Sequence, residues 1–131
     1  MAMKSFQVGI KGVIVNDNSE VLLVKSLKGY WEFPGGRIDD DETIDRTLTR
    51  ELKEEITNIS DIEIKEILHV TRMPFDVGND LGLVLVFVRV RAEIDNVPQI
   101  SSEHLEAGWF GLEEARGMLD DNAGQALANL F

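Results

Sequence analysis

Residues 36–55 read GRIDDDETIDRTLTRELKEE, a glycine turn followed by an acidic loop and a segment with helical periodicity. Aliphatic residues recur at every fourth position, at Ile44, Leu48, Leu52 and Ile56. This spacing predicts an amphipathic helix whose apolar stripe faces a core. Thr43 is suited to cap its start, and Asp45 in the first turn suits the helix dipole.

Three carboxylates of this helix, on Glu51, Glu54 and Glu55, stand at positions i, i+3 and i+4 and therefore share one face. Glu55 follows Leu48 by seven residues and projects almost into the apolar stripe, so we expect it to be the least hydrated. Burying ionised carboxylates without partners costs roughly several kcal/mol each. Because Arg50 alone cannot offset three of them, the pattern predicts a hard divalent cation with oxygen ligands.

The same residues resemble the sequence box of the Nudix hydrolases, G-x5-E-x7-R-E-U-x-E-E-x-G-U, where U is a bulky aliphatic residue. The matching positions are Gly36, Glu42, Arg50, Glu51, Leu52, Glu54 and Glu55. The chain departs from the box at its end, where Thr57 replaces the glycine and Asn58 replaces the aliphatic residue. Since asparagine tolerates positive φ, we expect Asn58 to take over the turn that ends the helix.

Two further stretches are similar to the family. Trp31–Gly36, WEFPGG, looks like its entry into the box, and Glu103–Phe110, EHLEAGWF, looks like its late acidic loop running into a strand. The resemblance implies an α/β fold, the Nudix α/β/α sandwich with a mixed β-sheet and the box as a loop-helix-loop. At 131 residues we expect one domain spanning 1–131.

The chemistry expected on these residues is metal-dependent hydrolysis of a phosphoanhydride bond. Mg²⁺, or alternatively Mn²⁺, would be held by Glu51, Glu54, Glu55 and, as the resemblance implies, the carbonyl oxygen of Gly35. Arg50 would orient a box glutamate through its planar guanidinium.

The general base is open among Glu51, Glu54 and Glu103, the last being similar in position to a late-loop glutamate that acts as base or extra ligand in parts of the family. Gly36 and Arg37 are assigned to substrate binding.

The box does not select the substrate. Members of the family cleave nucleoside diphosphates linked to various groups, so nucleoside triphosphates, ADP-ribose and dinucleotides all stay open. Pro74, sixteen residues after Asn58, resembles the ADP-ribose pyrophosphatase pattern, whereas the compact length is more similar to MutT-type enzymes. The alternative is a catalytically silent Nudix domain that acts as a nucleotide sensor or interaction module, and the intact glutamates argue against it.

The composition of the chain limits the classes of partner that it is expected to bind. A formal net charge of −11 argues against nucleic-acid and anionic-membrane surfaces, which rely on Lys and Arg, and favours a small-molecule nucleotide partner. The chain has no cysteine for a disulfide framework or thiolate site. Its start lacks the apolar stretch of a signal peptide, and the run 81–90 is too short to span a bilayer. We therefore expect a cytoplasmic monomer or homodimer.

The remaining sequence predicts the following elements. Strands are expected at 6–15, 20–25, 62–71 and 83–91, with a hairpin turn at 16–19. Residues 74–80 predict a loop close enough to touch a substrate, and 112–119 and 122–130 predict two short helices.

Several conspicuous side chains have structural interpretations. Trp31 and Trp109 are expected to pack rather than stack on a base. His69 and His104 lack paired metal-ligand partners in the sequence, so we expect neither to bind metal. The aspartates at 39–41 are equally compatible with a solvated loop, and their spacing excludes an EF-hand.

Overall fold

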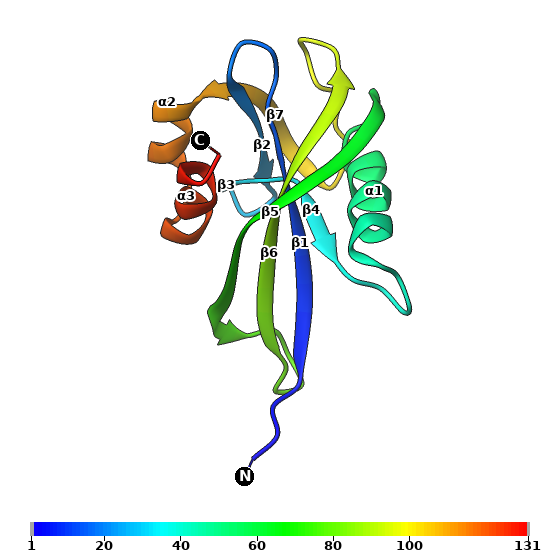
Figure 1. Ribbon diagram of the computed structural model, residues 1–131, viewed down its shortest axis with the longest axis vertical. Helices are drawn as coiled ribbons and strands as arrows, with labels where there is room; N and C mark the ends of the chain where they lie inside the picture. The colour runs from blue at the N-terminus through cyan, green and yellow to red at the C-terminus, as the bar shows by residue number, and fades with distance from the viewer. Residues whose placement is uncertain (1, 131) are drawn as a thin grey trace.

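A computed structural model of the protein describes residues 2–130 (Figure 1). The elements follow in the order β1 (Phe6–Ile14), β2 (Glu20–Ser26), β3 (Trp31–Glu32), β4 (Gly35–Arg37), α1 (Ile44–Glu55), β5 (Ile59–Asp76), β6 (Gly82–Ile94), β7 (His104–Gly111), α2 (Leu112–Met118) and α3 (Asp121–Ala128). The predicted box helix and both C-terminal helices are therefore present, with ends shifted by up to two residues.

The strands form two sheets between layers of helix. A four-stranded mixed sheet has the order β4-β1-β6-β5, in which β1 and β6 are parallel and the outer strands are antiparallel to their neighbours. A three-stranded antiparallel sheet has the order β3-β2-β7. Helix α1 lies on one flank, and α2 and α3 lie on the opposite flank (Figure 1). The predicted α/β/α sandwich with a mixed sheet is confirmed.

The turn at 16–19 is present, but the strands beside it do not form the predicted hairpin. Asn16 Oδ1 accepts hydrogen bonds from the backbone N–H groups of Asn18 at 3.0 Å and Glu20 at 2.9 Å. The flanking strands then enter different sheets and share a single bridge, between Val15 and Val21. The consecutive aliphatic residues of β2 are all fully buried, which requires apolar cover on both faces rather than one.

The predicted loop at 74–80 is shorter in the structure. Strand β5 continues to Asp76, which pairs with Gly82, so only residues 77–81 form the connection. Pro74 is tolerated within a strand because β5 is the edge of its sheet, where a missing N–H breaks no ladder. The proposed contact of this loop with substrate stays a prediction.

Helix α1 forms as its sequence predicts. Thr43 Oγ1 accepts a hydrogen bond from the N–H of Arg46 at 3.2 Å, the expected N-cap. The apolar stripe meets the first strand at Gly12, where a Cβ would lie 3.4 Å from Leu48 and 3.5 Å from Leu52. The buried cluster under the helix consists of Ile10, Ile14, Leu22, Leu48, Leu52, Ile56, Val86, Val88 and Val90.

The end of α1 differs from the expectation for Asn58. Ile56 caps the helix with extended backbone, φ −121°, and Asn58 is not among the described residues with positive φ. Instead the N–H of Thr57 donates to the carbonyl of Gln99 at 2.7 Å. The Asn58 amide donates to the carbonyl of Val97 at 3.2 Å and accepts from the N–H of Gln99 at 2.9 Å. Side-chain bonding thus replaces the glycine turn of the box.

Leu52→Ala is expected to lower the free energy of unfolding by about 2–5 kcal/mol, because Leu52 is fully buried and its truncation leaves a cavity. Denaturant unfolding measures the change. Leu27→Ala is the matched control, since Leu27 is 63% exposed, and its loss should be small. Equal effects of the two substitutions would contradict the packing described for α1.

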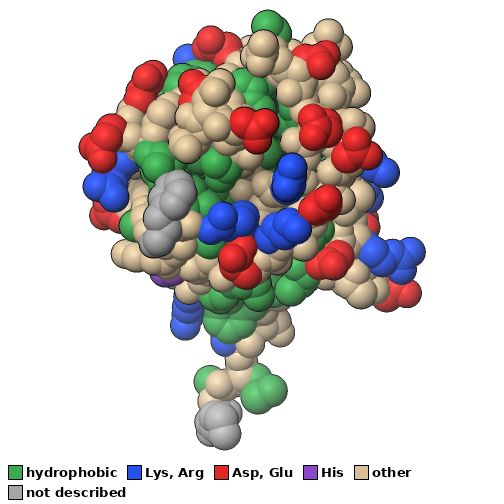
Figure 2. All heavy atoms as spheres, turned by 45° about the horizontal axis from the view of Figure 1, so that its top comes forward, with side chains coloured by type: hydrophobic (Ala, Val, Ile, Leu, Met, Phe, Trp, Pro, Cys, Tyr) green, Lys and Arg blue, Asp and Glu red, His purple; other side chains and the backbone are tan. Residues whose placement is uncertain are grey.

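The surface is mixed in charge. On the face in Figure 2, acidic side chains lie beside the basic ones rather than leaving a continuous basic patch. This agrees with the acidic composition of the chain. Among residues 2–130, no helix combines the length and apolar character needed to cross a membrane.

Candidate active site

Two glycines of β4 allow close approaches, Gly35 to strand β1 and Gly36 to Glu51 of α1. Gly35 has φ +151°, and a Cβ there would lie 2.0 Å from the carbonyl oxygen of Ile10. At Gly36 a Cβ would lie 2.2 Å from the carboxylate carbon of Glu51. Only glycine permits both approaches. The N–H of Gly35 consequently reaches Glu55 and donates to its Oε2 at 2.8 Å.

Glu55 is the buried member of the glutamate group, with 3% of its surface exposed. Burial raises the pKa of Glu55 to about 8, against the opposing influence of the His104 and Lys11 charges and of the Gly35 N–H. The expectation that Glu55 is the least hydrated glutamate is confirmed. An ionised Glu55 therefore needs more positive charge than its neighbours provide.

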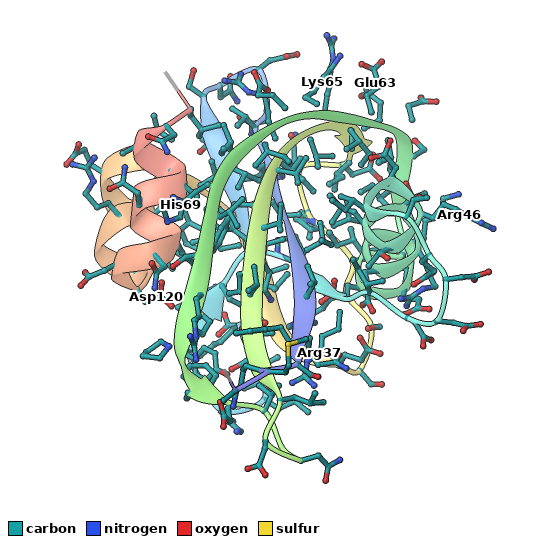
Figure 3. The ribbon with its side chains drawn as sticks, turned by 60° about the horizontal axis from the view of Figure 1, so that its bottom comes forward. Arg37, Arg46, Glu63, Lys65, His69 and Asp120 are labelled. Atoms are coloured by element: carbon teal, nitrogen blue, oxygen red, sulfur yellow. The ribbon has the colours of Figure 1, made fainter. Side chains whose placement is uncertain are left out.

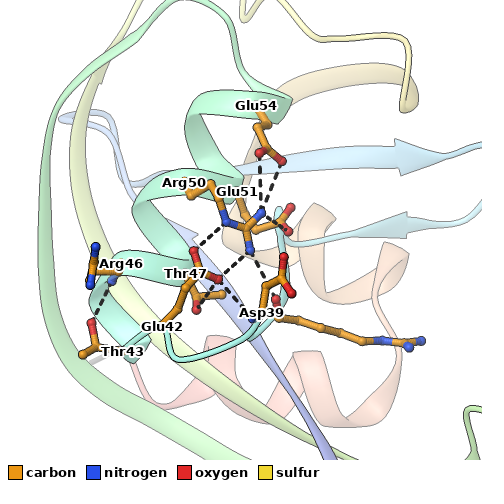
Figure 4. A network of polar contacts seen from close by, with 9 residues as sticks. Asp39, Glu42, Thr43, Arg46, Thr47, Arg50, Glu51 and Glu54 are labelled. Atoms are coloured by element: carbon orange, nitrogen blue, oxygen red, sulfur yellow. Dashed lines mark hydrogen bonds and ion pairs between the residues drawn. The ribbon is translucent and has the colours of Figure 1, made fainter.

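Arg50 joins the acidic loop to the helix (Figure 4). Its Nε and Nη2 donate to the two oxygens of Glu42 at 2.7 and 2.8 Å, a bidentate pair. Its Nη1 donates to Glu51 Oε1 at 2.9 Å and approaches Glu54 at 3.4 Å. The contact with Arg50 lowers the pKa of Glu42 to about 2, and contact with Glu42 raises the pKa of Arg50. Arg50 thus fixes the loop and the helix face together.

The three helix glutamates differ in hydration. The side chains of Glu51 and Glu54 are 17% and 49% exposed, and both share Arg50. Burial is the main cause that raises the pKa of Glu51; Arg50 opposes it, and the charges of Glu54 and Glu103 add to it. The charge of Glu103 therefore acts on Glu51 of this helix face.

His104 completes the cluster from the start of β7. One ligand atom from each of Glu55, Glu103 and His104 lies within 4.8 Å of the other two. The His104 side chain is 6% exposed, and its Nε2 lies 3.3 Å from Glu55 Oε1. No paired ligand for His104 was expected from the sequence, but pairing of β7 with β2 brings it beside Glu55, a residue far away in the chain. The expectation that His104 does not bind metal stays a prediction.

Two further charged side chains, those of Glu32 and Lys11, lie near His104. Its Nε2 lies 3.8 Å from Glu32 Oε1, and Lys11 Nζ lies 3.6 Å from the same oxygen. Burial raises the pKa of Glu32, but contacts with His104 and Lys11 outweigh it and leave that pKa lowered. Contact with Glu32 raises the pKa of His104 despite its burial.

Comparison with known proteins identifies the family of this chain. Residues 5–130 match the model of the NUDIX domain. The chain belongs to the Nudix family. Nudix hydrolase 8 of Arabidopsis thaliana is 38% identical over 122 residues, which cover 86% of this chain and 31% of that protein. An 8-oxo-dGTP diphosphatase of Proteus vulgaris is 42% identical over 50 residues, covering 34% of this chain and 45% of that protein.

Solved Nudix structures share the whole fold. A MutT NUDIX hydrolase from Burkholderia pseudomallei superimposes with a TM-score of 0.78 at 26% identity, covering 98% of this chain and all of that chain. The chain spans 31% of the length of the Arabidopsis relative and 45% of the length of the Proteus relative. Membership in the Nudix family is therefore shown for the domain.

The other residues singled out in the sequence lie at different positions around the Nudix box. Arg37 is exposed at the end of β4, and its carbonyl accepts a hydrogen bond from Arg50 Nη2 at 3.4 Å (Figure 3). His69 lies on β5 beside α3, with its ring 6.0 Å from that of Phe87 (Figure 3). Trp31 packs edge-on against Phe110 at 5.1 Å, as expected. Trp109 packs against the cluster under α1.

The donor set of the Nudix box fits a hard divalent cation. Ligand atoms of the buried Glu55 and of Glu103, which is outside the box, lie within 4.8 Å of each other. Glu51 and Glu54 lie on the same helix as Glu55, paired with Arg50, and are not part of that group. Arg50 is turned toward Glu42, Glu51 and Glu54 and has no described contact with Glu55. Arg50 therefore does not offset an ionised Glu55, and His104 and Lys11 leave its pKa raised, so ionised Glu55 favours an added cation.

Proposed function

We propose that this Nudix domain is a metal-dependent pyrophosphohydrolase, which hydrolyses the phosphoanhydride bond of a nucleoside diphosphate linked to another group. The observation that carries the proposal is the buried Glu55 carboxylate, hydrogen-bonded to Gly35 and grouped with Glu103. Burial of an acid beside other acids has a large unfavourable free energy unless the group binds a cation. A purely structural domain has no need of it.

Glu51, Glu54, Glu55 and the carbonyl oxygen of Gly35 are the residues that would hold Mg²⁺ or Mn²⁺. When bound, such an ion offsets the charge of a diphosphate and lowers the pKa of the attacking water. Arg50 keeps Glu51 and Glu54 on one side of the helix and holds the acidic loop through Glu42. Gly36 and Arg37 would face the substrate phosphates.

Glu103 is the general base in this proposal. Glu51 and Glu54 are both paired with Arg50, which holds their charge and restricts their movement. Glu103 is exposed in the turn just before β7, where it can meet water, and still lies within the cluster of Glu55 and His104. A carboxylate free of an arginine partner is the better proton acceptor.

Nucleoside triphosphates are the first substrates to test, because one relative is named 8-oxo-dGTP diphosphatase. ADP-ribose and dinucleoside polyphosphates belong in the same panel, since the box residues contact the diphosphate that all three share. The pocket that distinguishes them lies outside the box.

A phosphate-release assay over this panel is expected to show turnover with Mg²⁺, none in excess EDTA, and recovery when the metal is restored. After the protein is removed and Mg²⁺ is restored in every sample, pyrophosphatase converts the pyrophosphate from triphosphates to phosphate. Phosphatase is used only for ADP-ribose and the dinucleotides, which have no terminal phosphate until they are cleaved. Undiminished hydrolysis in EDTA would contradict the metal-dependent chemistry. Nucleotide binding without turnover on any substrate would instead identify a sensor domain.

A further inference from the structure

The buried carboxylate of Glu55 is contacted at both of its oxygens. On one side the backbone N–H of Gly35 donates to Oε2 at 2.8 Å. On the other side His104 Nε2 lies 3.3 Å from Oε1. A carboxylate held at both oxygens has a fixed plane, so the direction in which its free lone pairs point is set before any cation arrives.

His104 is itself held in place by charged side chains from two other strands. Nε2 also faces Glu32 Oε1 at 3.8 Å, and Lys11 Nζ lies 3.6 Å from that oxygen. The backbone N–H of His104 donates to the carbonyl of Ser101 at 3.4 Å. Strands β1, β3 and β7 therefore converge on one imidazole, and none of Lys11, Glu32 and His104 belongs to the residues of the box.

The hydrogen-bonding state of the ring identifies its role. His104 Nδ1 is buried and has no hydrogen-bond partner among the described residues. Nε2 is the ring nitrogen that faces the carboxylates of Glu32 and Glu55, which can only accept when ionised, so Nε2 carries a proton whether the ring is neutral or charged. With its proton there, Nε2 faces Glu55 Oε1 at 3.3 Å and cannot also be a metal ligand, since a protonated ring nitrogen has no free lone pair.

We propose that His104, supported by Glu32 and Lys11, is a positioning residue that orients the Glu55 carboxylate for divalent-cation binding. This inference rests on the proposed function, because it assigns Glu55 to the cation. Residues that hydrogen-bond to a metal ligand typically contribute about 10–100-fold to metal affinity or activity. His104 acts through Glu55 and touches no reacting atom.

The test measures Mn²⁺ affinity by electron paramagnetic resonance, with the Mg²⁺ dependence of turnover as a second readout. His104→Leu should weaken Mn²⁺ binding by about 10–100-fold. His104→Gln keeps an N–H near the position of Nε2 and should recover most of the affinity. His69→Leu is the matched control, since His69 packs against Phe87 away from α1, and it should bind Mn²⁺ like wild type. Unchanged affinity in His104→Leu overturns the proposal.

A double variant tests the support from Glu32. Glu32→Gln alone should weaken Mn²⁺ binding, and combined with His104→Leu it should add nothing, because Glu32 acts through the ring. Fully additive losses overturn this relay. If His104→Leu does not fold, as judged by circular dichroism, Glu32→Gln decides, and wild-type affinity in that variant overturns the proposal.

These readouts separate the proposal from the proposed function. Mn²⁺ binding that weakens in His104→Leu supports the positioning role even if no nucleotide is hydrolysed. Turnover in wild type without any change in His104→Leu supports the enzyme and rejects the role of His104. Absence of Mn²⁺ binding in wild type rejects the positioning role, whatever the nucleotide panel shows.

Discussion

Glu55→Gln is expected to lower kcat by about three orders of magnitude while leaving the fold intact. Glutamine keeps the shape of the side chain and an oxygen for the Gly35 N–H, but it removes the charge that would hold the cation. A loss of about 4 kcal/mol of transition-state stabilisation corresponds to that factor. Steady-state kinetics at the Mg²⁺ concentration that saturates wild type measures it. Glu114→Gln, an exposed glutamate on α2, is the matched control and should retain wild-type kcat.

The same substitution is expected to stabilise the metal-free protein, increasingly so as the pH rises. The pKa of Glu55 is about 8 in the folded state against 4.5 for an ordinary glutamate. Below the lower value Glu55 is protonated in both folded and unfolded chains, and its contribution to stability is fully present. Between pH 4.5 and about 8, Glu55 is ionised in the unfolded chain but stays protonated in the folded chain. The contribution of Glu55 to stability is therefore lost as the pH rises toward about 8.

Melting curves in EDTA at several pH values measure this effect. The Tm of Glu55→Gln should exceed that of wild type by a margin that grows between pH 5 and pH 8. In free energy of unfolding, this margin grows by at most about 1.4 kcal/mol per pH unit. Saturating Mg²⁺ should remove the advantage, because the ion stabilises only the glutamate. A constant Tm difference across this range would show that Glu55 ionises without restraint and is not the buried ligand described here.

Local sequence predicted the box helix well because its determinants are local. Thr43, the four-residue apolar spacing and the placement of Glu55 beside the stripe all act within a few turns of one helix. The close approach of Gly36 to Glu51 follows from the same box. Only Asn58 behaved differently, since its partners Val97 and Gln99 are some forty residues away in the chain.

Features that depend on strand pairing could not be predicted in this way. The separation of β1 and β2 into two sheets depends on which strands cover them, and the turn at 16–19 is compatible with either arrangement. His104 reaches Glu55 only because β7 pairs with β2 and α1 packs on β1. His104 itself therefore gave no signal of its contact with Glu55, although Glu103, directly before it in the sequence, had been assigned to the site.

Glu103→Gln is expected to lower kcat by about 10²–10⁴-fold while leaving Mn²⁺ affinity close to wild type. The loss follows because glutamine cannot accept the proton of the attacking water, and the retained affinity follows because Glu51, Glu54 and Glu55 still hold the cation. The acidic limb of the pH profile of kcat should also disappear, since a carboxylate base must be ionised to act. Glu106→Gln, an exposed glutamate on β7 three residues after Glu103, is the matched control.

The Mg²⁺ dependence of Glu103→Gln separates a base from an additional ligand. A missing ligand weakens binding, so excess Mg²⁺ should restore part of the lost rate, whereas a missing base leaves the saturated enzyme slow at any concentration. Rescue by Mg²⁺ would therefore move Glu103 into the ligand set and return the base to Glu51 or Glu54. Glu51 or Glu54 would then have to accept the proton while paired with Arg50. If one of them is the base, Arg50→Lys should change the rate most strongly, because it removes the planar guanidinium contact.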